Sequence, residues 1–255
     1  MKAILAAGGE ASIQDPLYPY TQGKPKALLE MAGKPMVQWV IDALNASSVV
    51  DSIVVVGLPP HTPLESRLPL RILPDHHGML ENFQAGARAI YEEERRDQVV
   101  LAVSADIPLI RGEMVDWVAQ NTQDIEADVY YHIIERHVME TRFPQSKRTY
   151  LRIEGREYCG GDLNALRLKA VLEADSLWNA MVQARKNPLK QAQLIGWDIL
   201  LLLLLGRLTI PEAERRFSRR LGLRARAISC PYAELGMDVD KPVQYELALR
   251  ELSAR

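Results

Sequence analysis

Two continuous apolar runs rich in β-branched residues constrain most strongly what this chain can fold into. Residues 51–57 read DSIVVVG and residues 98–104 read QVVLAVS. Such runs are typical of strands buried on both faces of a parallel sheet. A segment with apolar residues at helical spacing separates them. The chain is therefore predicted to form an α/β fold with a mainly parallel sheet and right-handed crossovers.

The remaining elements of the front half follow the same alternation. An apolar run at 3–7 predicts a first buried strand, and residues 36–47 predict a helix that Pro35 introduces. Residues 71–74 form a shorter candidate strand, and helices are expected at 82–96 and 112–121. Ligands of such sheets bind beyond the carboxyl ends of the strands. The Gly8-Gly9 turn and Asp106 both follow predicted strands, so both are expected at that edge.

The second half is less regular. Strands are predicted at 127–134 and 224–229, a basic loop at 141–155 leads into a strand, and glycines interrupt another at 156–168. Residues 169–220 predict a mostly helical insertion or subdomain within a single domain, 1–255, and Pro242 opens a terminal helix at 241–252. The leucine-rich run 199–205 is too short to cross a membrane. We expect it to form a buried helix, with contact to a membrane surface as the alternative.

Net charge limits the possible binding partners, and cysteine content indicates the redox state of the protein. The chain has 31 basic and 33 acidic residues, so no global field recruits nucleic acid or an anionic membrane. Cys159 and Cys230 are far apart and lack metal-like spacing, which favours reduced thiols. The N-terminus shows no signal pattern, and we expect a cytoplasmic protein without a transmembrane segment. The oligomeric state stays open, and a homodimer is compatible with the sequence.

A paired glycine and two lysines form the first candidate site. Gly8 and Gly9 leave the first strand without a Cβ that would block backbone amides from a bulky anion. Lys24 and Lys26 flank Pro25 and supply point charges for phosphate. The alternative is an ordinary tight turn followed by a solvated basic loop.

Carboxylates supply the second and third candidate sites. Asp106 ends a buried strand, and a carboxylate there beside a phosphate site is a natural Mg²⁺ ligand. Asp238 and Asp240 stand at alternate positions before the terminal helix. The alternatives are capping of the 112–121 helix or a surface salt bridge for Asp106, and capping of the terminal helix for Asp240.

Four motifs in order resemble one family. LAAGG, GKPKALLEMAGKPM, VSADIPL and GMDVDKPVQYELAL are similar to the nucleotidyltransferases of the GT-A-like fold. That family includes molybdenum cofactor guanylyltransferases, cytidylyltransferases for sugar alcohol phosphates and sugar-nucleotide pyrophosphorylases. The resemblance implies a three-layer, Rossmann-like sheet. It also implies Mg²⁺-dependent transfer of a nucleoside monophosphate from a nucleoside triphosphate to a small, phosphorylated acceptor, with release of pyrophosphate.

The resemblance also assigns residues to roles. Lys26 and Asp106 would be catalytic, and Asp106 and Asp240 would hold Mg²⁺, with Asp238 as the competing choice. Glu81 and Asn82 fall where relatives recognise base and ribose, although capping of the following helix is an equal alternative. The implied nucleotide contacts are Ala6, Ala7, Gly8, Gly9, Lys24, Lys26, Glu81 and Asn82.

The acceptor side is less well defined. Lys147 and Arg148 are candidates for an anionic acceptor, with a solvated basic loop as the alternative. Gly161 and Asn164 resemble the acceptor-side strand of relatives, with a β-bulge as the alternative. His76 and His77 lack a partner motif for metal.

One departure from the family pattern affects the expected function. The loop after Gly9 lacks the usual Arg, so a triphosphate would lose a bidentate clamp. Lys24, the Lys147-Arg148 pair or Arg152 could replace it. The alternatives to transfer are a non-catalytic nucleotide-binding protein and a glycosyltransferase that uses a nucleotide sugar. The single acid of Ser104-Ala105-Asp106 argues against the glycosyltransferase, which usually carries Asp-x-Asp.

Overall fold

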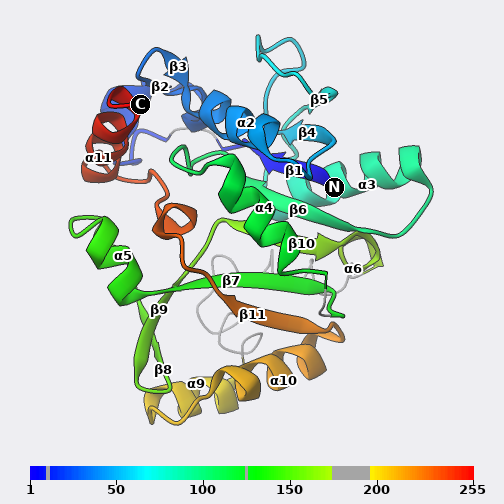
Figure 1. Ribbon diagram of the computed structural model, residues 1–255, viewed down its shortest axis with the longest axis vertical. Coiled ribbons are helices and arrows are strands. Elements are labelled where there is room, and N and C mark those ends of the chain that lie inside the picture. Colours follow the sequence, from blue (N-terminus) through cyan, green and yellow to red (C-terminus); the bar gives the residue numbers. More distant parts are fainter. Residues whose placement is uncertain (10–11, 124–125, 174–195) are drawn as a thin grey trace.

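A nine-stranded mixed sheet forms the centre of the molecule (Figure 1). The computed structural model describes residues 1–9, 12–123, 126–173 and 196–255 of the chain. Strand order is β5-β4-β1-β6-β10-β7-β9-β8, with β11 on the other edge of β7. The strands are β1 (Lys2–Ala6), β4 (Ser52–Val56), β5 (Leu70–Leu73), β6 (Val99–Ser104), β7 (Val129–Glu135), β8 (Leu151–Ile153), β9 (Arg156–Gly160), β10 (Leu163–Arg167) and β11 (Ala225–Ser229).

Helices cover both faces of this sheet, and a small hairpin of β2 (Glu30–Met31) and β3 (Lys34–Pro35) lies beside the last helix. The helices are α1 (Tyr18–Thr21), α2 (Met36–Ala46), α3 (Met79–Glu94), α4 (Gly112–Gln120), α5 (Arg136–Arg142), α6 (Leu168–Glu173), α9 (Trp197–Leu204), α10 (Ile210–Leu221) and α11 (Pro242–Ser253), with 3-10 turns η1 (Lys26–Leu28) and η2 (Ala233–Gly236).

Alternating side chains of β1 define the three layers. Ala3 and Leu5 face one core, which α2, α4 and α11 cover. Ile4 faces the opposite core, where α3 and α6 pack. All three β1 side chains are at most 1% exposed, as expected for a strand that neighbours cover on both faces. β5, β4, β1 and β6 run parallel, so their carboxyl ends meet at one edge.

Two extra residues interrupt the pairing along β7. β9 pairs with the end of β7 through Ile133↔Gly160, and β10 pairs with its start through Tyr130↔Ala165. Both lie on the edge opposite β11. Two β7 residues therefore face four residues of the opposing segment, 161–164. The glycine-interrupted strand predicted at 156–168 is two strands joined by a bulge, which re-aims the side chains at the junction.

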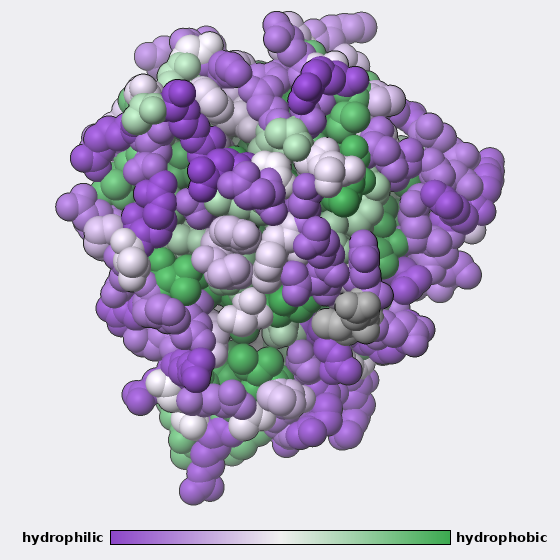
Figure 2. All heavy atoms as spheres, viewed as in Figure 1, coloured by the Kyte–Doolittle hydropathy of each residue, from purple (hydrophilic) through white to green (hydrophobic). Residues whose placement is uncertain are grey.

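The α/β fold and its mainly parallel front half confirm the sequence prediction, with local corrections. The helix predicted at 82–96 begins at Met79, because Gly78 in an extended conformation is its N-cap. The run 199–205 does not form a buried helix. Ile199 is buried, whereas Leu201, Leu204 and Leu205 are 56%, 84% and 56% exposed. Figure 2 shows hydrophobic atoms at the surface of the lower end of the molecule, where α9 and α10 lie in Figure 1.

The predicted helical region at 169–220 contains α6, α9 and α10 within the described residues, and 174–195 lie outside them. The single-domain organisation stays a prediction. Cys159 and Cys230 are free, buried thiols. No helix among the described residues is long and apolar enough to span a membrane.

Candidate active site

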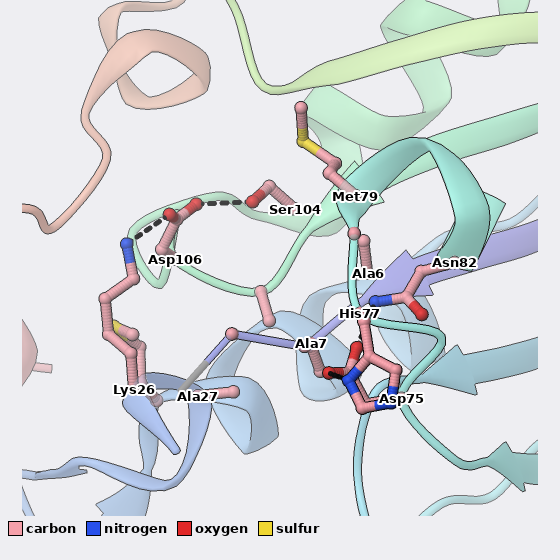
Figure 3. Close-up of a pocket in the computed structure, with 15 residues that line it drawn as sticks. Ala6, Ala7, Lys26, Ala27, Asp75, His77, Met79, Asn82, Ser104 and Asp106 are labelled. Atoms are coloured by element: carbon pink, nitrogen blue, oxygen red, sulfur yellow. Dashed lines mark hydrogen bonds and ion pairs between the residues drawn. The ribbon is translucent and has the colours of Figure 1, made fainter. Parts of the chain in front are cut away.

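A pocket of about 460 Å³ opens at the carboxyl ends of β1 and β6 (Figure 3). The turn after β1 forms one wall, and the segment that enters α3 forms another. Lys26 reaches in from η1, and Asp106 follows β6. The lining residues are Ala6, Ala7, Gly8, Gly9, Lys26, Ala27, Met36, Asp75, His77, Gly78, Met79, Asn82, Ser104, Ala105 and Asp106.

Lys26 joins two carboxylates that lie far apart in sequence. Its Nζ donates to Asp106 Oδ2 at 2.7 Å and to Asp240 Oδ1 at 2.5 Å. The side chains of Lys26 and Asp106 are 25% and 17% exposed, and that of Asp240 is 53% exposed. The predicted grouping of Lys26, Asp106 and Asp240 therefore exists as one contact at the pocket mouth, whereas their catalytic and metal-binding roles stay predictions.

Neighbouring polar groups hold both carboxylates in place. Ser104 Oγ donates to Asp106 Oδ1 at 2.6 Å, which leaves Oδ2 for Lys26. The backbone of Val239 donates to the Asp106 carbonyl at 2.9 Å and ties the two acidic segments together. Buried Gln244 accepts from the Asp240 backbone at 3.0 Å and donates to the Ser146 carbonyl at 3.2 Å. These contacts fix the separation of the carboxylates.

Helix capping explains neither aspartate. α4 begins at Gly112 with Arg111 as its N-cap, and α11 begins at Pro242 with Lys241 as its N-cap. Neither N-cap residue makes a side-chain cap hydrogen bond. The capping alternatives for Asp106 and Asp240 are therefore wrong, and both carboxylates point at Lys26 instead.

The charges of this group reinforce one another. Burial alone would lower the pKa of Lys26, but Asp106 and Asp240 raise it above its ordinary value. Burial acts to raise the pKa of Asp240, and the charge of Lys26 and its hydrogen bond outweigh that effect and lower it. Lys26 therefore stays an ammonium and Asp240 a carboxylate across the neutral range.

The two glycines after β1 serve different purposes. A Cβ on Gly8 would lie 2.3 Å from Asn82 Nδ2 and 2.4 Å from Asp75 Oδ1, so glycine is needed for close packing there. Gly9 has φ of +126°, which side chains rarely adopt, and nothing lies within 4 Å of its Cβ position. Gly9 thus presents open backbone to the pocket, whereas Gly8 admits the Asp75–Asn82 pair.

Asn82 positions Asp75. Its Oδ1 accepts from the His76 backbone at 2.8 Å, and its Nδ2 donates to Asp75 Oδ1 at 2.8 Å. Asn82 is 2% exposed and lies inside α3, so the capping alternative is wrong. Glu81 occupies the first turn of α3 and does not line the pocket. Asp75, which the sequence did not single out, presents its second oxygen near His77, 3.7 Å from His77 Nδ1.

A second ion group contains Arg148, which the sequence predicts to contact the acceptor. Arg148 contacts the Asp238 carboxylate through Nη1, and its Nη2 donates to the Gly160 carbonyl at 3.1 Å and lies 3.8 Å from Asp162 Oδ2. Burial by itself would lower the pKa of Arg148, but Asp238 and Asp162 raise it. Burial raises the pKa of Asp238 to about 6 against the opposing charge of Arg148. Arg148 is therefore occupied by protein groups.

The bulge between β9 and β10 places Asp162 in this group. Its backbone donates to Leu235 at 2.8 Å, and its carbonyl accepts from Ser104 at 2.9 Å, which joins it to both acidic segments. Asp162 Oδ2 is buried without a hydrogen-bond partner among the described residues. Burial, and next the charges of Asp106 and Asp238, raise the pKa of Asp162 to about 8.

Asn164 supports the bulge rather than facing the pocket. Its Oδ1 accepts from the His132 backbone at 2.8 Å, and its Nδ2 donates to the Gly161 carbonyl at 2.7 Å. The amide side chain thus replaces ladder bonds that the extra residues remove, as the bulge alternative predicted. Lys24 and Lys147 are exposed and form no ion pair within the described chain. Their proposed contacts stay predictions.

Sequence reasoning missed Asp75, Ser104, Asp162 and Gln244. The rule that located Gly8 and Asp106 also applies to Asp75, which follows β5 at the same sheet edge. Asp162 and Gln244 gave no comparable signal, because a register shift and a helix docking place them there.

The donor set suits a hard cation that also binds phosphate. Two carboxylates converge on one positive charge, the Lys26 ammonium, which lies where a metal cation would be held. Mg²⁺ is usually held by one or two carboxylates together with substrate phosphates. Among the described residues, no group of three His, Cys, Asp or Glu side chains could hold a metal ion. The carboxylates of Asp106 and Asp240 therefore fit a Mg²⁺ site, whereas the Asp238 carboxylate is already paired with Arg148.

The chain matches a known protein family. Residues 3–200 match the MobA-like NTP transferase domain. The chain belongs to the MobA-like NTP transferase family. This membership confirms the resemblance found in the motifs and makes the protein a nucleotidyltransferase, which decides against the glycosyltransferase alternative. No curated protein sequence matches the chain.

Solved structures agree with this assignment. A hypothetical transferase from Thermus thermophilus is 37% identical, with a TM-score of 0.81 over 96% of this chain and 98% of that chain. A CMP:2-keto-3-deoxy-manno-octonic acid synthetase complexed with CTP is 15% identical, with a TM-score of 0.59 over 99% and 98% of the two chains. A 2-C-methyl-D-erythritol 4-phosphate cytidylyltransferase, also from Thermus thermophilus, is 16% identical, with a TM-score of 0.53 over both full chains. The last two share the fold.

Proposed function

We propose that this MobA-like transferase moves a nucleoside monophosphate from a nucleoside triphosphate to a small, phosphorylated acceptor and releases pyrophosphate in a Mg²⁺-dependent reaction. The observation that carries the proposal is the contact of Lys26 with Asp106 and Asp240 at the mouth of a glycine-walled pocket. Cation, carboxylates and open backbone amides are what a triphosphate and its metal require.

The residues of the chain act mainly by positioning and charge. The amides around Gly8 and Gly9 would bind phosphate oxygens, and Lys26 would neutralise charge that develops around the α-phosphate. Asp106 and Asp240 would hold Mg²⁺, which neutralises phosphate charge when bound. Ser104 orients the Asp106 carboxylate, and Gln244 holds the backbone of Asp240. An ionised phosphate oxygen of the acceptor would attack the α-phosphorus, and the bond from that phosphorus to the bridging oxygen of the β-phosphate would break. Pyrophosphate would then leave without a covalent enzyme intermediate.

Asp75 is the proposed base-recognition group. Asn82 fixes one oxygen of the carboxylate, and the other can accept a hydrogen bond from a ligand. A carboxylate accepts but does not donate, and the one Watson–Crick donor of uracil, N3–H, lies between two carbonyl oxygens that repel a carboxylate, so a base with an exocyclic amino group fits better than uracil. We therefore expect UTP to be the poorest substrate, and Asp75→Asn, which adds a donor, to reduce that discrimination in pyrophosphate-release assays.

On the acceptor side, Lys147 is the cation proposed for the acceptor phosphate, because Arg148 already binds Asp238 and Gly160. Gly161 and Asn164 would shape that side through the bulge. Lys24 or Arg152, both exposed, are the proposed substitutes for the missing loop Arg.

A nucleotide screen tests the proposal. Thermal unfolding is measured with each common nucleoside triphosphate and several nucleotide sugars, with and without Mg²⁺, followed by pyrophosphate release with phosphorylated acceptors. Binding to the native state raises the midpoint. We expect a Mg²⁺-dependent shift with at least one triphosphate. Absence of any shift contradicts the proposal, and binding without pyrophosphate release favours a non-catalytic nucleotide-binding protein.

A further inference from the structure

We propose that Lys26 occupies the place of the divalent cation between Asp106 and Asp240, so that metal and nucleotide bind together and the metal alone binds weakly. The inference rests on the proposed function, because it concerns the same metal and nucleotide site. It adds an order of binding and a second role for Lys26, beyond contact with phosphate.

The contact geometry sets up the competition. One ammonium has three donors, and Lys26 directs two of them at carboxylate oxygens at 2.7 Å and 2.5 Å. A divalent cation held by the same two carboxylates would lie close to the ammonium. Like charges at such separations repel strongly where solvent is partly excluded. The metal and the Lys26 ammonium therefore cannot occupy this position together.

The side chain of Lys26 has a second anion site within reach once nucleotide binds. It lines the pocket while its backbone is held in η1, where the Leu29 amide donates to the Lys26 carbonyl at 3.0 Å. A lysine is a point charge on a flexible four-carbon stem, so rotation of the side chain alone can redirect it. Phosphate groups in the pocket would attract the ammonium and free the two carboxylates for the metal.

The second ion group lacks this freedom. Arg148 binds Asp238 and also donates to the Gly160 carbonyl, and its side chain is 15% exposed. A planar guanidinium with several fixed contacts exchanges its partners less readily than a lysine. The exchange is therefore confined to the Asp106–Lys26–Asp240 group.

Coupling follows from the exchange. If phosphate binding removes Lys26 from the carboxylates, nucleotide increases metal affinity, and metal increases nucleotide affinity by the same factor. Without nucleotide, the protein therefore binds the metal only weakly.

Direct metal titration tests the inference without an activity assay. Mn²⁺ is the probe, and free Mn²⁺ is measured by electron paramagnetic resonance without nucleotide. We expect Lys26→Met to bind one Mn²⁺ at least about tenfold more tightly than wild type, because the competing charge is gone. Lys26→Arg keeps a cation at this position and should resemble wild type. Lys34→Met, which removes a lysine–aspartate pair outside the site, is the matched control.

The outcomes are decisive in both directions. Equal or weaker Mn²⁺ binding by Lys26→Met overturns the inference, as does tight binding that persists when Asp106→Asn is added. Lys26→Gln replaces the Met variant if circular dichroism shows that the latter is unfolded. The proposed reaction fails separately: tight Mn²⁺ binding by Lys26→Met together with no pyrophosphate release by wild type supports the inference and rejects the reaction.

Discussion

Two ion groups, each of one basic side chain and two aspartates, lie side by side in this transferase and differ in what they can do. In each, one basic side chain contacts two aspartates. Lys26 joins Asp106 and Asp240 at the pocket mouth, whereas Arg148 contacts Asp238 and lies near Asp162 on the acceptor side. The Arg148 group also includes a backbone carbonyl.

Exposure separates the two groups further. Each group has one aspartate that is mostly buried, Asp106 at 17% and Asp238 at 14% exposed. The second aspartate is more exposed in the Lys26 group, where Asp240 is 53% exposed, than in the Arg148 group, where Asp162 is 35% exposed. A point charge with a half-exposed partner can leave at modest cost, whereas a buried guanidinium leaves an uncompensated carboxylate behind. The Lys26 group is therefore suited to exchange with ligands, and the Arg148 group to holding β9, β10 and the segment before α11 together.

The largest expected effect comes from Asp106→Asn. Loss of this carboxylate removes the group shared by Lys26 and the proposed metal, so kcat/KM for pyrophosphate release should fall at least about a hundredfold. Asp42→Asn, in the surface pair with Lys34, is the control and should retain activity. Full activity of Asp106→Asn would mean that the exchangeable group is not the reaction centre.

Arg148→Met should destabilise the fold more than Lys26→Met. Removal of Arg148 leaves the Asp238 charge unpaired and buried, with an expected loss of about 3 kcal/mol in the free energy of unfolding. Lys26→Met should cost less, about 1–2 kcal/mol, because Asp240 is half exposed and Ser104 still donates to Asp106. Urea denaturation measures both. Equal losses would remove the distinction between the groups.

Asp162→Asn should stabilise the protein in alkaline solution. The raised pKa of Asp162, about 8 against an ordinary 3.8, means that the folded state favours the protonated form. Wild-type stability should fall relative to the variant as pH rises from about 4 to about 8 and then level off.

Because 35% of the Asp162 side chain is exposed, solvent screening reduces the expected gain to about 2 kcal/mol at pH 8. Denaturation is measured without divalent cations. Another aspartate, Asp116, cannot serve as the control position, because its carboxylate accepts hydrogen bonds from Ser47 and Ser48. A gain independent of pH would show that charge on Asp162 is not the cause.

A similarly small effect is expected at the bulge itself. Asn164→Ala removes two hydrogen bonds that replace ladder pairing, so the free energy of unfolding should fall by about 1–2 kcal/mol. Asn121→Ala, which loses one bond at a helix end, should cost less. A negligible effect of Asn164→Ala would mean that the bulge does not depend on this side chain.

Local sequence patterns were enough to predict that Gly8 and Asp106 lie at one edge of the sheet. The β-branched runs at 51–57 and 98–104 correspond to β4 and β6, which run parallel to β1 on either side, so Gly8 and Asp106 lie at one edge. Lys26 reaches the same pocket from η1. Strand-end rules need no knowledge of distant contacts, which is why this half of the site was predictable.

The acceptor side depends on register and on docking of distant segments. Asp162 enters the group only because two extra residues separate β9 from β10, and Arg148 is occupied only because Asp238 docks beside it. The same limit applies to 199–205, where apolar composition predicted burial but the packing leaves three leucines exposed. No local periodicity encodes such tertiary placements.

Anomalous diffraction from the protein crystallised with Mn²⁺ and a non-hydrolysable nucleoside triphosphate would show directly whether the metal replaces Lys26 between Asp106 and Asp240. The account predicts one Mn²⁺ within about 2.2 Å of carboxylate oxygens of Asp106 and Asp240. Lys26 Nζ should then contact a phosphate oxygen, and Arg148 should still contact Asp238. Mn²⁺ bound at Asp238 and Asp162, or a Lys26 that remains between Asp106 and Asp240 with nucleotide in the pocket, would contradict it.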